Sequence, residues 1–394
     1  MPEVSIILPM YMCEAYVNGV LDMLCGQDMR EIEIICVIDG SPDRTRELAE
    51  KYAAKEPRIR VIQQDHGGAG KARNTGMAAA RGKYLMFPDA DDIFTEDYVS
   101  CLYKAAEQNE ADIAVCHLNT HNMVYDVTMK RMGYDPLKVP VNKVFSPRDL
   151  PDLFTSFYHG PKNKIFRRGS IIKNGTYFSE TQSVNDQYFV TAALCCAERI
   201  IAIPDTLYTY RERHNPHSIS ENRAEHAADF IIGLRDLYKL LQTRNEEKQY
   251  KDSFMKCWEQ NLHQFAKYDD SGTFVNAVVK ELNEREPWRS MNGKELFRSI
   301  RLDTAIPETK LRLLKTRLKL KKEPSASGSL QFAIARTERE IRNISAIRAA
   351  LAKSHEDMPR KGTLVLSLIR SFQDHGFRGS VMTILQRSAL LRAR

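Results

Sequence analysis

The stretch YLMFPDADDIF, residues 84–94, joins a short apolar run directly to three carboxylates, those of Asp89, Asp91 and Asp92. An apolar run of this length that ends in a polar turn is typical of a buried β-strand. Taken alone, the acidic part fits a polar turn as well as a metal site, in which a cation would relieve the repulsion between the carboxylates. Its position in the chain decides between these two interpretations.

Short apolar runs alternate with helical patterns upstream of this stretch. Such alternation predicts βαβ units and an α/β fold with a mostly parallel sheet covered by helices on both faces. A further helix and strand are predicted between Tyr98 and Ala114, and extended pieces and loops between residues 117 and 160. The predicted strands are residues 4–8, 33–37, 59–63 and 84–87, and the predicted helices between them are residues 15–25, 44–55 and 69–80.

Polar or turn-forming residues follow each predicted strand. They are residues 9–11, 38–43, 64–68 and 88–92. Because ligands of such sheets bind at the carboxyl ends of the strands, we expect these four segments to line one pocket. Carboxylate oxygens are the ligands that Mg²⁺ and Mn²⁺ prefer, and such ions leave coordination positions for phosphate oxygens. The strand-end position therefore favours a Mg²⁺ or Mn²⁺ site over a plain turn.

Two other segments at this edge have a functional and a purely structural interpretation. Asp39 either caps its own turn or accepts hydrogen bonds from a base or ribose. The glycine-rich segment at residues 66–76, which carries Lys71 and Arg73, either holds an anion at a helix N-terminus or is an ordinary turn. The chain lacks both G-x-G-x-x-G after its first strand and a P-loop motif, which argues against NAD, FAD and P-loop chemistry.

Composition and charge set the class of protein and its compartment. With 394 residues the chain is long enough for two domains, and it contains no apolar run that would span a membrane and no secretion signal. Its eight cysteines form no C-x-x-C pair, so we expect reduced thiols in a cytoplasmic protein and no metal site built from sulfur.

The basic residues are concentrated at the end of the chain. Residues 301–394 hold 20 Lys and Arg against 8 Asp and Glu, whereas the whole chain holds 58 against 51. This region favours an anionic surface such as membrane lipid over nucleic acid as its partner. The segment 310–322 fits a basic amphipathic helix on lipid, and equally the basic face of a helical bundle.

Four motifs in order resemble those of the family 2 glycosyltransferases, which are inverting enzymes of the GT-A fold that build bacterial polysaccharides. The family pattern P-x-Y matches residues 9–11, and V-D-D-G-S-T-D matches residues 37–43, except that Ile38 replaces the first Asp. N-G-G-x-x-x-A-R-N-x-G matches residues 66–76, and G-x-Y-x-x-F-x-D-x-D-D matches residues 82–92. The resemblance covers roughly residues 4–220.

The second half of this region is also similar to the family. PKNKIFRR at residues 161–168 resembles the N-K-L-[FY]-R-R element, and residues 201–220 resemble the closing segment. SVNDQYFV at residues 183–190 stands where the family has an acidic pair at a helix start, with Asn185 in the place of the commoner first acid.

The resemblance implies a set of site residues. The implied general base is Asp186, whose structural alternative is a helix N-cap. Asp91, with Asp89 and Asp92, would hold Mn²⁺ or Mg²⁺ beside the departing diphosphate. Residues implied to bind the nucleotide sugar are Pro9, Tyr11, Asp39, Gly68, Lys71, Arg73, Asp89, Ala90, Arg211, Arg213 and His214.

The resemblance further implies transfer of a hexosyl or N-acetylhexosaminyl group from a nucleotide-diphosphate sugar, with UDP-sugars favoured, to a hydroxyl of a cell-envelope glycan or lipid-linked acceptor. The enzyme is expected in the cytoplasm, at the inner face of the membrane. A non-catalytic glycan-binding relative and a sugar nucleotidyltransferase remain alternatives. The latter should carry a basic, glycine-rich loop after its first strand, which PMYMCEAY at residues 9–16 lacks.

The expected organisation has four parts. A glycosyltransferase domain spans residues 1–220, with the nucleotide sugar bound by residues 1–115 and the acceptor side formed by residues 116–220. A helical region at 221–323, a linker at 324–329 and a basic helical region at 330–394 follow. The C-terminal helices are candidates for lipid binding or for an oligomer interface.

Overall fold

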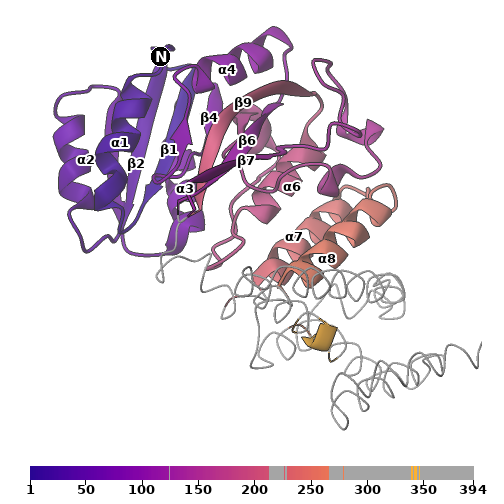
Figure 1. The fold of residues 1–394 in the computed structure, drawn as a ribbon. Helices are drawn as coiled ribbons and strands as arrows, with labels where there is room; N and C mark the ends of the chain where they lie inside the picture. Colours follow the sequence, from indigo (N-terminus) through magenta and orange to yellow (C-terminus); the bar gives the residue numbers. More distant parts are fainter. Residues whose placement is uncertain are drawn as a thin grey trace, which may run out of the picture. The chain divides into compact units, whose positions relative to one another are not determined.

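The computed structural model describes residues 1–123, 125–212 and 229–265, together with residues 226, 278, 339, 341–343 and 346. Its central feature is a nine-stranded mixed sheet in the order β3-β2-β1-β4-β8-β6-β9-β5, with β7 paired to β6 (Figure 1). The strands are β1 (Val4–Met10), β2 (Ile32–Asp39), β3 (Ile59–Gln64), β4 (Tyr84–Met86), β5 (Ile93–Phe94), β6 (Ile113–Asn122), β7 (Val127–Arg131), β8 (Lys164–Arg167) and β9 (Ile200–Glu212).

The first four strands run parallel, as the alternation in the sequence predicts. β1 pairs in parallel with both β2 and β4, and β2 pairs in parallel with β3. All eight residues of β2 are buried, which is the pattern of a strand covered on both faces. The parallel register places the carboxyl ends of these strands at one edge of the sheet, where the predicted pocket residues follow.

Helices cover both faces because successive strand side chains point in opposite directions. On one face Ile6 and Leu8 share a buried apolar cluster with residues of α1, α2 and α4. On the other face α3 packs so closely that a Cβ on Gly76 would lie 2.4 Å from the Ile7 side chain. The helices of this half are α1 (Glu14–Cys25), α2 (Thr45–Ala53), α3 (Gly68–Ala79) and α4 (Tyr98–Gln108).

Residues 113–212 add an antiparallel part to the sheet. β8 runs antiparallel to β4 and β6, β6 and β9 pair in parallel, and β5 pairs antiparallel with β9. The segment between residues 117 and 160 holds the end of β6, the exposed strand β7 and two short 3₁₀ turns, η1 (Pro147–Asp149) and η2 (Leu153–Thr155). The strand β8 is followed by α5 (Arg168–Lys173) and, after a loop, by α6 (Gln187–Cys196).

An aromatic cluster attaches α6 to the same face as α3. Phe189 of α6 stacks on Phe178 with the ring centroids 3.9 Å apart, and both rings contact Phe87 just after β4. These three side chains are fully buried. Burial of each large apolar side chain is worth about 1.5–3 kcal/mol, so the cluster fixes α6 and the loop before it against the end of β4.

Two further helices follow in the range that the sequence assigns to a helical region. They are α7 (Phe230–Thr243) and α8 (Lys251–Phe265). The sheet, α7 and the part of α8 up to Cys257 belong to one compact unit. The domain boundary at residue 220 stays a prediction, and the linker at 324–329 and most of the basic region at 330–394 lie outside the described residues.

Most of the cysteines lie in the interior of the described part. Six of the eight are buried, and Cys25 and Cys101 are half-buried. None of the helices that the structure describes is both long enough and apolar enough to cross a membrane.

Candidate active site

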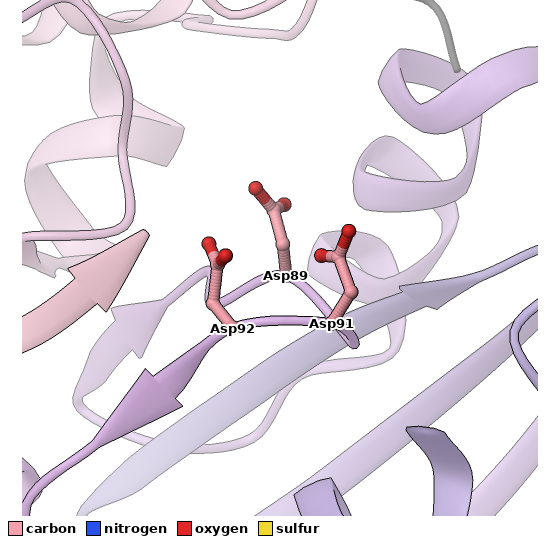
Figure 2. Close-up of side chains that lie close together, drawn as sticks. All are labelled: Asp89, Asp91 and Asp92. Carbon is pink, nitrogen blue, oxygen red and sulfur yellow. The ribbon is translucent and has the colours of Figure 1, made fainter. Parts of the chain in front are cut away.

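The acidic turn, residues 88–92, connects β4 to β5 at the carboxyl end of the parallel strands. Its three carboxylates rise on the same side of the turn (Figure 2). One oxygen atom from each of Asp89, Asp91 and Asp92 lies within 4.8 Å of the other two. Three carboxylates this close repel one another strongly unless cations lie among them.

A lysine from a distant segment supplies one such cation. β4 and β8 pair antiparallel with Tyr84 opposite Arg167 and Leu85 opposite Phe166, and continuing this register places Lys162 opposite Asp89. The Lys162 Nζ lies 2.5 Å from Asp89 Oδ2 and 2.8 Å from Asp92 Oδ2. Its side chain is 6% exposed, so the ammonium group is enclosed by the protein.

Asp92 is the most buried carboxylate of the turn, with no exposed surface. Its Oδ2 accepts hydrogen bonds from Lys162 Nζ and from the Tyr208 hydroxyl at 2.9 Å, and its Oδ1 accepts one from the backbone N–H of Arg211 at 2.8 Å. Asp92 therefore connects the acidic turn to β9. Its assignment as a metal ligand stays a prediction.

The charges of the acidic turn shift the pKa values of its members. Burial alone would raise the pKa of Asp89, but Lys162 and Arg73 outweigh it and lower that pKa to about 2. Burial raises the pKa of Asp92 despite the attraction of Lys162. Burial lowers the pKa of Lys162, but the charges of Asp89 and Asp92 outweigh it and keep that pKa well above its ordinary value.

Arg73 on α3 is the second cation of the turn, and it has a second partner. One guanidinium nitrogen, Nη2, donates to Asp89 Oδ1 at 2.7 Å, and the other, Nη1, donates to Asn185 Oδ1 at 2.8 Å. The Arg73 side chain is 7% exposed and lies over the Phe178 ring. It connects the acidic turn to the loop that precedes α6.

Asp186, the predicted base, is the N-cap residue of α6. Its side chain makes no capping hydrogen bond, so its place at the helix start is not explained by capping. The residue is half-buried. Burial lowers the pKa of the neighbouring His159. The hydrogen bond between His159 and the Phe154 carbonyl and the negative charge of Asp186 both oppose that shift.

The loop before Asp186, residues 179–185, is held in an unusual backbone conformation. Val184 has a φ of 54°, which is a strained value for a β-branched residue. The loop packs directly on α3, because a Cβ on Gly70 would lie 2.0 Å from the carbonyl oxygen of Ser179 and 3.0 Å from the Cβ of Asn185. Glycine at position 70 thus permits the contact that brings Asn185 to Arg73.

The glycine-rich turn before α3 already holds an anion, and that anion belongs to the chain. The Asp39 carboxylate accepts hydrogen bonds from the backbone N–H groups of Gly67 at 2.9 Å and Gly68 at 2.8 Å, and from the side chain of Gln64 at 2.7 Å. Gly68 has a φ of 87°, which glycine adopts without strain. The Asp39 carboxylate is 3% exposed and is turned to these donors. A contact of this carboxylate with a nucleotide base stays a prediction.

Two aromatic rings lie at the neighbouring strand ends. Tyr11 after β1 stacks on His66, with ring centroids 4.2 Å apart, and both side chains are exposed. His66 also places its Nδ1 3.0 Å from Asp39 Oδ2. The remaining residues of the predicted nucleotide-sugar set at this edge are Pro9 and Lys71, which are half-buried, and Ala90, which is buried.

Arg211 on β9 reaches the acidic turn, as the predicted set requires. β5 and β9 pair with Ile93 opposite Thr209, so Arg211 lies beside the turn that precedes β5. Its Nε donates to the carbonyl oxygen of Asp91, and its guanidinium lies over the Tyr16 ring. Arg213 and His214 lie outside the described residues.

The acidic turn fits a hard divalent cation in its chemistry, although protein donors already occupy many of its oxygens. The fit rests on three carboxylates that converge within 4.8 Å. Both oxygens of Asp89 accept from Arg73 and Lys162, and both oxygens of Asp92 accept from protein donors. A cation would therefore join an acidic turn whose charge is already partly compensated.

Two residues of this site have no role in the sequence-based set. Lys162 lies in the element PKNKIFRR at residues 161–168, for which the sequence predicts no role for the lysine. Asn185 is noted in the sequence only as the residue that replaces an acid before Asp186. The antiparallel pairing of β8 with β4 brings Lys162 to Asp89, and that pairing was not predicted. The local sequence offers only two lysines, Lys162 and Lys164, before a short apolar run, and this pattern does not show which strand they lie beside.

Comparisons with known proteins agree with this architecture. Residues 5–175 match the family described as Glycosyl transferase family 2. The uncharacterized glycosyltransferase EpsJ of Bacillus subtilis is 37% identical over 226 residues, which cover 56% of this chain and 63% of EpsJ. The poly(ribitol-phosphate) beta-N-acetylglucosaminyltransferase TarS of Staphylococcus aureus is 26% identical over 248 residues, which cover 61% of this chain and 40% of TarS. The chain thus spans less than two thirds of the length of either relative.

The fold is also found in a solved structure. The crystal structure of S. aureus TarS residues 1–349 in complex with UDP-GlcNAc superposes with a TM-score of 0.58 at 20% identity, and the match covers 92% of this chain and 93% of that one. At this identity the likeness concerns the fold. It confirms the predicted α/β fold of the GT-A type, with a sheet flanked by helices, and the sheet is mixed where a mostly parallel one is predicted.

Proposed function

We propose that the chain is a glycosyltransferase that transfers a sugar from a nucleoside-diphosphate sugar to an acceptor hydroxyl with inversion at the anomeric carbon; the match of residues 5–175 to glycosyl transferase family 2, the likeness to EpsJ and the GT-A fold support this proposal. UDP-sugars are the favoured donors, since the TarS structure of the same fold holds UDP-GlcNAc. The acceptor we propose is a cell-envelope glycan or a lipid-linked glycan.

The observation that carries this proposal is the connection between two parts of the site. Arg73 links the acidic turn to Asn185, the residue directly before Asp186. Arg73 therefore connects the acidic turn, which is suited to a departing diphosphate, to the segment that carries Asp186, which is suited to act as a general base. Both functions must act on opposite sides of one anomeric carbon in an inverting displacement.

In the proposed reaction the acceptor oxygen attacks the anomeric carbon as the bond from that carbon to the diphosphate breaks. Asp186 accepts the proton of the acceptor hydroxyl, an effect typically worth about 10²–10⁴ in rate. The electron pair of the broken bond leaves with the nucleoside diphosphate. We propose that Arg211, whose guanidinium lies beside the acidic turn, binds that product.

We propose that Asp91 and Asp89 hold Mn²⁺ or Mg²⁺ when the donor is bound. The ion would supply positive charge to the departing diphosphate. Asp92 would serve chiefly to fasten the turn, since its side chain has no exposed surface, unlike that of Asp89, and its two oxygens accept from Lys162, Tyr208 and Arg211. Asp39 would hold the glycine-rich turn in place beside the bound nucleotide.

A donor screen tests the proposal. Purified protein is incubated with UDP-, GDP- and CDP-sugars and Mn²⁺, with and without a chelator, and release of the nucleoside diphosphate is measured. We expect release from one nucleotide class and a fall in rate with the chelator. Release from none of them, with intact folding, would contradict the donor class.

We also propose that the protein acts in the cytoplasm at the inner face of the membrane, with the basic residues after 301 directed to anionic lipid. Co-sedimentation with vesicles that contain phosphatidylglycerol, compared with vesicles of phosphatidylcholine alone, tests this. Binding that is equal for both vesicles would argue against an electrostatic contact. Gel filtration of the same protein tests whether it forms an oligomer, for which the helices predicted in the C-terminal region are the candidate interface.

A further inference from the structure

Lys162 is enclosed on several sides at the centre of the acidic turn. Its ammonium contacts Asp89 and Asp92 at 2.5 and 2.8 Å, and it lies over the Tyr210 ring, 4.4 Å from the ring centroid. Its backbone carbonyl accepts a hydrogen bond of 2.5 Å from the Tyr98 hydroxyl. Both ends of the residue are therefore fixed, and the charge cannot leave the turn without breaking two buried ion pairs.

The charges around the turn are nearly balanced before any metal or donor binds. Among the described residues, Lys162 and Arg73 contact the carboxylates, and the Arg211 guanidinium lies beside the turn. Much of the negative charge of the turn is thereby compensated, whereas a site of three uncompensated carboxylates would attract a divalent cation strongly. The balance depends mainly on Lys162, because it is the cation that touches two of the three carboxylates.

We infer that Lys162 is a built-in cation of the acidic turn, which weakens binding of a free divalent cation and makes the metal enter together with the donor diphosphate. The inference rests on the proposed function for the identity of that donor. Lys162 repels a second cation and occupies carboxylate oxygens that the cation needs. A diphosphate brings negative charge that offsets this repulsion, so metal and donor bind more tightly together than either binds alone.

Binding of Mn²⁺ alone, with no donor present, tests the inference. The affinity is measured by isothermal titration calorimetry and by the electron paramagnetic resonance signal of free Mn²⁺. Lys162→Met keeps the length and the apolar stem of the side chain but removes the charge. We expect it to bind Mn²⁺ about tenfold or more tightly than the wild type, because the repulsion is gone and two carboxylates become available.

Lys83→Met is the matched control, since it removes one positive charge just before β4, at the end of that strand opposite to the acidic turn. Lys83 is 43% exposed and pairs with Glu107, away from the acidic turn. We expect its Mn²⁺ affinity to equal that of the wild type. If Lys162→Met does not fold, Lys162→Gln, which keeps a hydrogen-bond donor near Asp92, gives the same comparison.

If Lys162→Met and Lys162→Gln bind Mn²⁺ no more tightly than the wild type does, the inference is overturned. This outcome is separate from failure of the proposed reaction, because the titration uses neither a nucleotide sugar nor an acceptor. A second measurement adds UDP to the wild type. The inference requires that UDP tighten Mn²⁺ binding more in the wild type than in Lys162→Met, and an equal effect in both would also overturn it.

Discussion

Arg73 Nη1 donates a hydrogen bond of 2.8 Å to Asn185 Oδ1, across 112 residues of sequence. The same guanidinium holds Asp89 through its other nitrogen, at 2.7 Å. A planar fork with two fixed donors is what allows one side chain to orient both partners. The pair therefore sets the position of the loop before Asp186 relative to the acidic turn.

Removal of the Asn185 amide should reduce turnover more than it weakens binding of the nucleotide-sugar donor. In Asn185→Ala the loop loses its bond to Arg73, and we expect kcat to fall about tenfold while the donor KM changes little, because a misplaced base affects chemistry more than binding. Steady-state kinetics with the donor identified by the screen measures both. Asn18→Ala, on the exposed face of α1, is the control. A raised KM with unchanged kcat would contradict a positioning role.

The base assignment of Asp186 makes a stronger prediction. Asp186→Asn keeps the size of the side chain but cannot accept the proton, so we expect a loss of about 10²–10⁴ in kcat with nearly normal donor affinity. Calorimetry with UDP and turnover assays measure the two quantities. Glu180→Gln changes an exposed carboxylate in the same loop and should be close to wild type. Near-normal turnover in Asp186→Asn would refute the assignment.

The proposed metal ligand Asp91 can be tested by binding alone. We expect Asp91→Asn to weaken Mn²⁺ binding in the presence of UDP by about tenfold or more, because a neutral amide is a poorer ligand than a carboxylate. Asp126→Asn, which removes a charge from a side chain that is 95% exposed on the hairpin before β7, is the control. Equal affinities of the two variants would exclude Asp91 as a ligand.

The lowered pKa of Asp89 predicts a pH dependence of stability. A carboxylate with a folded-state pKa of about 2, against an ordinary value of 3.8, stabilises the fold above about pH 4 and loses this contribution as the pH falls toward 2. Urea unfolding of the wild type and Asp89→Asn should therefore differ most above pH 4 and converge on acidification. A difference that grows as the pH falls would contradict the pairing with Lys162 and Arg73.

The close contact at Gly70 predicts that even a methyl group disturbs the loop. In Gly70→Ala the new Cβ would meet the carbonyl oxygen of Ser179 at 2.0 Å, so the loop must move. We expect a loss of about 1–3 kcal/mol in the free energy of unfolding and a lower kcat. Gly19→Ala on α1 is the matched control, because nothing lies within 4 Å of its Cβ, and alanine there should stabilise the helix by about 0.4–1 kcal/mol.

The sequence predicts the parallel half of the sheet well because local patterns determine it. The apolar runs correspond to β1, β2, β3 and β4 within a few residues, and the helical patterns correspond to α1, α2 and α3. The resemblance to the glycosyltransferase family and the GT-A fold are confirmed by the family match and the TarS structure. The individual site residues stay predictions that the experiments above address.

The rest of the site depends on pairings between distant segments, which local patterns do not reveal. Lys162 reaches Asp89 through antiparallel β8, and Asn185 reaches Arg73 through a loop packed on Gly70. Asp39 shows a different difficulty. Its pattern allows both a turn role and a contact with a base or ribose, and its oxygens accept hydrogen bonds from the backbone of the glycine-rich turn. A carboxylate that holds a loop and one that holds a ligand leave the same signal in a sequence.

The partners of Asp92 have a consequence for biosynthesis. They lie 70, 116 and 119 residues downstream, at Lys162, Tyr208 and Arg211. On a ribosome the acidic turn emerges long before these partners, so the full set of hydrogen bonds to Asp92 cannot form until the chain has been made through β9. The parallel half of the sheet can assemble earlier, from contacts between neighbours in sequence. Synthesis thus completes the scaffold before the site, and a chain truncated before residue 208 would keep Asp92 and Lys162 but lack Tyr208 and Arg211, the partners of Asp92 on β9.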